Sequence, residues 1–181
     1  MAQRRSSYGY EDLLACGRGD LFGPGKARLP LPPLLMLDRI THIDGTSGTF
    51  GSGQIVAELG ISGNARLDWV FGCHFKGDPV MPGCLLLDAM WQILGFFLGW
   101  SGAAGRNRAL GVGEVKLKRM VTPDVECLQY SVDVKSTAPA GSNIPTANGL
   151  IRADGRLVYT AEDLRVGIVQ AHQEGAPTRS A

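Results

Sequence analysis

The sequence contains little of what marks several common classes of protein. It has four cysteines, three histidines and only 7% aromatic residues among 181 positions. The cysteines have neither CxxC spacing nor a zinc-like arrangement with the histidines, so we expect no metal site. They are Cys16, Cys73, Cys84 and Cys127, and we expect them to be free thiols in a reducing, cytoplasmic environment.

An excess of charge of one sign is also missing. The chain has 18 Lys and Arg against 17 Asp and Glu, which gives a net charge of +1. This balance offers no argument for nucleic-acid binding, so an electrostatic partner would have to be met by a local patch. The N-terminal residues MAQRRSSYGYEDLL are basic but lack the apolar segment of a signal peptide, so we expect no export signal.

No apolar run is long enough for a predicted membrane span. The longest is about 17 residues and contains Asp88 and Gln92, whereas a bilayer requires about 20 apolar residues. With 44% hydrophobic residues and no repeat, the chain has the length and content of one domain, which we place at residues 1–169. We expect the polar segment 170–181 to be a disordered tail.

The most apolar stretch predicts a buried helix over residues 83–100. Pro82 and Gly83 suit a helix start, because proline tolerates the first turn, where its missing N–H would have no partner. Apolar side chains cover every side of this helix, so it should be buried all round. Its strongly polar side chains, Asp88 and Gln92, are four residues apart and share one face, where the amide can orient the carboxyl.

Asp88 and the residues before it suggest acid–base chemistry. A buried carboxyl is costly to ionise, so it either has a partner or its pKa rises and it becomes a general acid. His74 lies in a loop rich in glycine and proline and is a natural base. The N–H groups of Gly83 and Cys84 suit a developing oxyanion. Each feature alone is often structural, but together they indicate proton abstraction next to a carbonyl and loss of a leaving group.

Apolar residues that alternate or cluster predict strands on both sides of the helix. The predicted strands span residues 34–43, 49–59, 109–120, 127–136, 144–153 and 157–169. Asp154-Gly155 is the strongest hairpin signal, and the turn at 44–48 joins the first two strands. We also expect a short helix over 7–15 with Ser7 as a possible cap, and an extended connector over 29–33. This order argues for an α+β fold in which a curved antiparallel sheet wraps a helix.

The segment GCHFKGDPVMPGCLLLDAMWQ closely resembles the active-site segment of the bacterial beta-hydroxydecanoyl acyl carrier protein dehydratases. Further segments match in the same order, up to about Val169: SYGYEDLLACGRGDLFG, LPPLLMLDRI, LGVGEVK and DGRLVYTAEDLRVG. Sister dehydratases without isomerase activity carry Glu at the position of Asp88. The chain departs from the family at Leu86, where the family usually has Gly. The resemblance implies the hotdog fold.

The resemblance also implies the reaction. A 3-hydroxydecanoyl carrier thioester would lose water to give the trans-2-enoyl product, which would be isomerised to cis-3-decenoyl thioester for unsaturated fatty acid synthesis. His74 would be the base, Asp88 the acid and Gly83 N–H the oxyanion donor. No metal or organic cofactor would be needed, because the phosphopantetheine arm arrives with the substrate. The residues that we expect to bind substrate are Phe75, Val80, Gly83, Cys84 and Gln92.

The expected partners are an acyl carrier protein and a second copy of the chain. Basic residues that could bind the acidic carrier are Lys76, Lys135, Arg152 and Arg165. The resemblance implies a homodimer in which His74 of one subunit faces Asp88 of the other. Two alternatives are a thioesterase of the same fold, with Asp88 activating water, and a non-catalytic acyl-binding module. We expect no catalytic role for His42 or His172.

Overall fold

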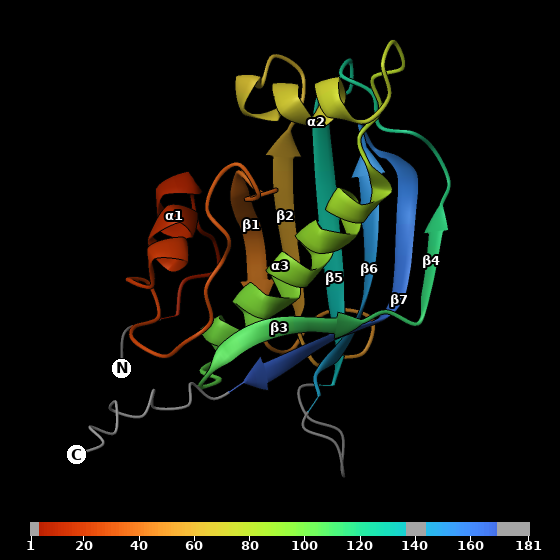
Figure 1. Ribbon diagram of the computed structural model, residues 1–181. Helices are drawn as coiled ribbons and strands as arrows, with labels where there is room; N and C mark the ends of the chain where they lie inside the picture. The colour runs from red at the N-terminus through yellow and green to blue at the C-terminus, as the bar shows by residue number, and fades with distance from the viewer. Residues whose placement is uncertain (1–3, 137–143, 170–181) are drawn as a thin grey trace, which may run out of the picture.

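The computed structural model describes residues 4–136 and 144–169 (Figure 1). The predicted tail at 170–181 lies outside the described residues. The helices are α1 (Tyr10–Arg18), the 3-10 helix η1 (Ala65–Leu67), α2 (Asp68–Cys73) and α3 (Gly83–Ser101). The strands are β1 (Arg39–Asp44), β2 (Gln54–Gly60), β3 (Arg106–Gly111), β4 (Glu114–Leu117), β5 (Cys127–Ser136), β6 (Thr146–Ala153) and β7 (Arg156–Val169).

One antiparallel sheet curves around the long helix α3 (Figure 1). Its strand order is β1-β2-β5-β6-β7-β3, and β4 pairs with another part of β7. Alternate residues of β2 and β5 are buried, so one face of the sheet packs on the helix. Helix α2 lies across the end of the sheet at which α3 begins (Figure 1). The predicted α+β hotdog architecture is therefore confirmed.

Helix α3 is the core of the domain. By length and composition it could cross a membrane, but most of it is buried inside the domain. Burial is complete from Gln92 to Gly99, whereas Cys84 near the start is exposed and Leu85 and Leu87 are only partly covered. The prediction of a helix buried all round is thus wrong for the first half of α3 in a single chain, because the sheet covers only one side of it there.

The first helix begins later than predicted, at Tyr10 instead of residue 7. Ser7 is not its cap, because the preceding residues are extended and Tyr8 forms a β-bridge with Ile40. The start is stabilised by Asp12, whose carboxylate accepts a hydrogen bond from the Gly9 N–H at 3.0 Å. Gly19, with a φ of 94°, ends the helix.

Two predicted strands are also divided or shortened. The strand predicted over 109–120 is two short strands, β3 and β4, which pair with different parts of β7. The strand predicted from residue 34 begins at Arg39. The backbone of Leu34 and Met36 is hydrogen-bonded to the Gln92 side chain of α3 instead of to a neighbouring strand. The segment that contains these two residues therefore lies outside the sheet.

The hairpin predicted at Asp154-Gly155 is confirmed. Both residues have positive φ values, 48° and 79°, and they join β6 to β7. This combination is typical of the two-residue turn that matches the twist of antiparallel strands. The carboxylate of Asp154 also accepts hydrogen bonds from the N–H groups of Glu126 and Cys127, so the turn is fastened to the start of β5.

Candidate active site

The helix start at Gly83 presents free donors, as the sequence predicted. Pro82 is the residue before the helix, and no side chain caps this end. The Leu85 N–H donates to the Pro82 carbonyl at 3.0 Å. A helix cannot satisfy its own first N–H groups, so those of Gly83 and Cys84 point out of the helix start. They carry the positive end of the α3 dipole and favour a negative oxygen.

Asp88 is held by Gln92, one turn further along α3. The Gln92 amide nitrogen donates to Asp88 Oδ2 at 2.7 Å and to the Leu34 carbonyl at 2.8 Å. Its amide oxygen accepts from the Met36 N–H at 3.2 Å. These backbone groups fix which end of the amide is the nitrogen, so the group facing Asp88 is a donor. The predicted orientation of the carboxyl by Gln92 is present, but Gln92 is itself 95% buried and is a supporting residue more than a substrate contact.

The half-buried Asp88 lines a cavity of about 390 Å³. This cavity is bounded by α3, by β3 and by the segment that precedes β1. Its lining is partly apolar and partly basic: Arg28, Leu29, Pro30, Leu34, Asp88, Trp91, Gln92, Asn107, Arg108 and Ala109. Arg28 and Arg108 were not predicted as site residues, because they are distant from Asp88 in the sequence. Leu86 does not line this cavity; it is 3% exposed and belongs to the core.

His74 lies directly after α2, at its C-cap, and is partly buried. Its Nδ1 is 3.0 Å from the Val80 carbonyl oxygen. A carbonyl can only accept, so Nδ1 carries the proton and Nε2 of the neutral ring has a free lone pair. The ring also packs on Phe75, with centroids 4.0 Å apart. Val80 therefore acts on the site through its backbone, while its side chain is 6% exposed and is part of the core.

Within the described part of one chain, His74 does not line the cavity of Asp88. The residues that line the Asp88 cavity include none from the loop 74–82. Of the predicted substrate residues, Gly83 and Cys84 lie at the helix start near that loop, while Gln92 lies with Asp88. Asp88 and Gln92 thus share one cavity, and His74 lies with the loop that precedes α3.

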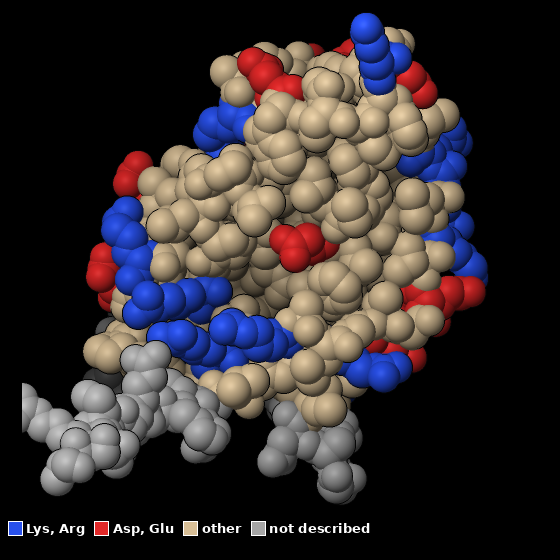
Figure 2. Space-filling view, in the orientation of Figure 1, with Lys and Arg blue, Asp and Glu red and all other residues tan. Residues whose placement is uncertain are grey.

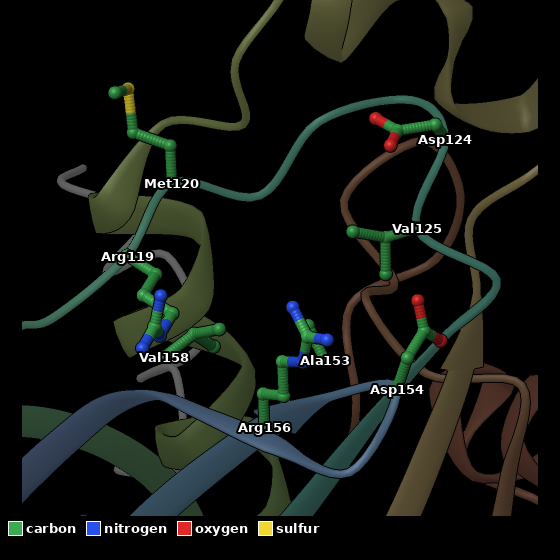
Figure 3. A pocket seen from close by; sticks show the side chains of 8 residues that line it. All are labelled: Arg119, Met120, Asp124, Val125, Ala153, Asp154, Arg156 and Val158. Atoms are coloured by element: carbon green, nitrogen blue, oxygen red, sulfur yellow. The ribbon is translucent and has the colours of Figure 1, made fainter.

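A second cavity, of about 400 Å³, lies at the end of the sheet where β6 and β7 meet the segment between β4 and β5 (Figure 3). In Figure 3, Arg119 and Arg156 lie toward one side of it and Asp124 and Asp154 toward the other. It contains no predicted site residue, and Asp154 is occupied by backbone hydrogen bonds. The cavity of Asp88 is therefore the better candidate for an active site.

The face in front of α3 is largely uncharged (Figure 2). Acidic atoms appear near its centre, and basic side chains gather along its lower border. Large apolar side chains are exposed in the loop after α2 and in the segments from β3 to β5. They are Phe75 at 55%, Leu110 at 53%, Leu117 at 63% and Met120 at 74%. Of these side chains, Leu117 lies beside Gly83 at the start of α3.

The basic residues proposed for carrier binding divide into two groups. Lys135 and Arg165 lie near Thr146 at the start of β6, and Lys135 is paired with Asp163 at 2.6 Å. Arg152 lies near the other end of β6, six residues further, which is about 20 Å along a strand. Lys76 is exposed on the loop beside His74. Only Lys76 and Arg152 therefore lie toward the α2 end of the sheet.

Several solved structures have a fold similar to that of this chain. The dehydratase heterocomplex ApeI:P from Xenorhabdus doucetiae has a TM-score of 0.60 at 17% identity over 79% of this chain and 89% of that chain. A hypothetical thioesterase with coenzyme A from Streptococcus pneumoniae TIGR4 has a TM-score of 0.52 at 12% identity, covering 72% and 84%. Cj0977, a virulence protein of Campylobacter jejuni, has a TM-score of 0.54 at 10% identity, covering 80% and 92%.

These likenesses show a shared fold, the hotdog fold, in which a curved sheet wraps the long helix α3. The family can be stated more narrowly. The FabA-like domain matches residues 29–162, and the chain belongs to this family. The match contains α2, the loop with His74, and α3 with Asp88 and Gln92.

Proposed function

We propose that the protein is a 3-hydroxyacyl carrier protein dehydratase that also isomerises its decenoyl product. The observation that carries this proposal is the Asp88 carboxyl, held by the Gln92 amide at 2.7 Å and open to a cavity. His74 with a free Nε2 and the uncapped start of α3 supply the other groups that the reaction needs. The resemblance of the loop and helix sequence to the decenoyl dehydratases supports the same reaction.

The dehydration proceeds by proton transfer. Nε2 of His74 takes a proton from C2 of the thioester, and the electron pair moves to the carbonyl oxygen as an enolate stabilised by the Gly83 N–H. The enolate then forms the C2–C3 double bond as the C3–O bond breaks. Asp88 gives its proton to the departing hydroxyl, which leaves as water. Afterwards His74 holds a proton and Asp88 has lost one, so transfer of a proton from one to the other restores the enzyme.

This reaction draws on no metal or organic cofactor. The thioester itself makes the C2 proton acidic, and the phosphopantetheine arm belongs to the carrier-bound substrate. The protein contributes a base, an acid, an oxyanion donor and a cavity. A thioesterase would instead need a nucleophilic water activated by Asp88, and it would not require His74, so the products distinguish the two reactions.

The complete site lies between two copies of the chain. His74 does not line the described cavity of Asp88, and a second subunit can supply a histidine to it. The exposed Leu110, Leu117 and Met120, with the partly covered start of α3, form an apolar surface that a partner would bury. Among the described strands, β3 is at the end of the sheet order, and its outer edge pairs with none of them, so a partner strand can pair there.

An acidic carrier protein docks at the α2 end of the sheet. Lys76 and Arg152 were predicted for this role, and two further basic residues, Arg119 and Arg156, line the second cavity near the β6–β7 turn and support it. Carrier binding through exposed charges is weakened by salt, because such charges are screened beyond about 10 Å at 0.1 M ionic strength. Lys135 does not take part, since it is paired with Asp163.

The first prediction concerns the catalytic pair. His74→Ala and Asp88→Asn should each lower turnover of 3-hydroxydecanoyl carrier protein by about 100-fold or more, because each removes an acid or base. Mass spectrometry of the acyl product, which should show loss of water, provides the assay. His42→Ala and Asp124→Asn are matched controls and should retain near-normal rates. A folded variant at either site with near-normal dehydration contradicts the proposal, and release of free thiol by the wild type would favour a thioesterase.

The second prediction concerns the shared site. If His74 and Asp88 come from different subunits, mixing the two inactive variants leaves one intact site in each mixed dimer. Random mixing should then restore roughly a quarter of wild-type activity. Subunits carrying both substitutions, mixed with the His74→Ala variant, should restore none. A monomer by light scattering at micromolar concentration, or no recovery after verified subunit exchange, would rule out the shared site.

The third prediction concerns the carrier. Raising the salt concentration should raise the KM for carrier-bound substrate and leave that for a short soluble thioester nearly unchanged. Lys76→Ala should weaken this salt dependence, whereas Lys135→Ala, at the other end of the sheet, should not. Equal salt effects on the two substrates would remove electrostatic docking from the proposal.

The fourth prediction concerns isomerisation. In the trans-2-decenoyl product the C4 protons are acidic, so His74 can take one and a proton can return to C2 to give the cis-3 isomer. Dehydratases that do not isomerise their product carry Glu at the position of Asp88. The aspartate in this chain therefore supports the isomerisation step. Chromatography should therefore show both decenoyl isomers. A preparation that dehydrates rapidly and gives only the trans-2 isomer would contradict the step.

A further inference from the structure

The short segment η1–α2 carries His74, and it was not predicted from the sequence. Only two of its side chains are fully buried, Leu67 at 2% and Val70 at 0% exposure. Most of its other residues face solvent, among them Asp68 and Trp69. Phe71 is partly buried and also packs against the core, so three apolar side chains anchor the segment. Such apolar contacts are not directional and do not by themselves set its orientation. Additional contacts must therefore fix the direction in which it delivers the histidine.

Arg66 of η1 provides those contacts. Its Nη1 donates to the Tyr10 hydroxyl of α1 at 3.0 Å, and its guanidinium lies 4.6 Å from the centre of the Tyr10 ring. Its Nη2 forms an ion pair with Asp38 Oδ1, just before β1. The other oxygen of Asp38 accepts from the Gly60 N–H at the end of β2, at 2.8 Å. One guanidinium thus joins η1 to α1 and to the ends of β1 and β2.

These contacts are partly protected from water. The side chains of Arg66 and Asp38 are 34% and 26% exposed. By comparison, the Arg39 side chain in the neighbouring Arg39–Glu58 pair is 60% exposed. A charged hydrogen bond that is shielded and whose carboxylate also binds a backbone N–H is more rigid than an ordinary surface pair. The cluster of Tyr10, Asp38 and Arg66 can therefore hold η1 in one place.

We infer that Arg66 is a positioning residue for His74, and that α1 takes part in the site through Tyr10. This inference rests on the proposed function. The Tyr10–Asp38–Arg66 cluster fixes η1, and through α2 it fixes the backbone of His74. The His74 ring is oriented directly by the Val80 carbonyl oxygen, 3.0 Å from Nδ1. A base displaced by about 1 Å loses up to about 100-fold in rate, whereas binding of a long acyl chain depends little on it. Tyr10 lies in α1, before residues 29–162 that the FabA-like domain matches.

The test compares Arg66→Met, Arg66→Lys and Tyr10→Phe in the full-length protein, with Arg39→Met as the matched control. Arg39→Met also removes an ion pair between neighbouring segments, but one without contact to η1. Arg66→Met should lower kcat about 10- to 100-fold with little change in KM. Arg66→Lys should recover part of this loss, Tyr10→Phe should lower kcat by a few-fold, and Arg39→Met should stay near wild type.

A second readout does not depend on activity. The nitrogen signals of the His74 imidazole are measured by NMR with ¹⁵N-labelled histidine. In the wild type they should show a protonated Nδ1, and in Arg66→Met they should no longer show this single tautomer. If the wild type lacks dehydratase activity, the proposed function fails while this readout still reports on positioning. A folded Arg66→Met variant with unchanged kcat and unchanged His74 signals overturns the inference. If Arg66→Met does not fold, unchanged kcat and signals in both Arg66→Lys and Tyr10→Phe overturn it.

Discussion

The burial of α3 is the constraint on which the rest of the structure depends. A helix with apolar side chains on all sides is stable in water only when it is covered on all sides. The curved sheet and the N-terminal segment together bury its second half, from Gln92 to Gly99, and Tyr8 and Phe22 pack against Phe96 there. The first half, which carries Cys84, Leu85 and Asp88, is covered on one side only. The same surface that remains to be buried is therefore the surface on which the proposed chemistry takes place.

Gln92 shows how the fold and the site share one interaction. Its side-chain amide hydrogen-bonds to the Leu34 carbonyl and the Met36 N–H, in place of a neighbouring strand. The same amide nitrogen donates to the carboxyl of Asp88. The two tasks support each other, because backbone groups fix the direction of the amide and the amide then fixes the acid. A buried amide with all of its groups paired is rigid, whereas an unpaired one would be costly.

The other half-site is built by a different means. His74 stands at the end of a short helical segment, and its ring is oriented by the Val80 carbonyl. Arg66, Tyr10 and Asp38 fasten that segment to the edge of the sheet and to α1. The acid thus depends on the core helix, and the base depends on polar contacts at the end of the sheet. Such independent supports suit a site whose two halves come from two subunits.

The sequence by itself determined the elements that follow from local patterns. The helix predicted over 83–100 is observed over Gly83–Ser101, β5 has the predicted bounds, and the Asp154-Gly155 turn forms the hairpin. Spacing alone also predicted that Gln92 would face Asp88, since residues four apart share a helix face. Only the tertiary structure decided that the 34–38 segment lies outside the sheet, that Arg28 and Arg108 line the cavity of Asp88, and that Arg66 meets Tyr10 and Asp38. These features depend on residues that are distant in sequence, so their positions are set by packing of the whole chain and not by any local pattern.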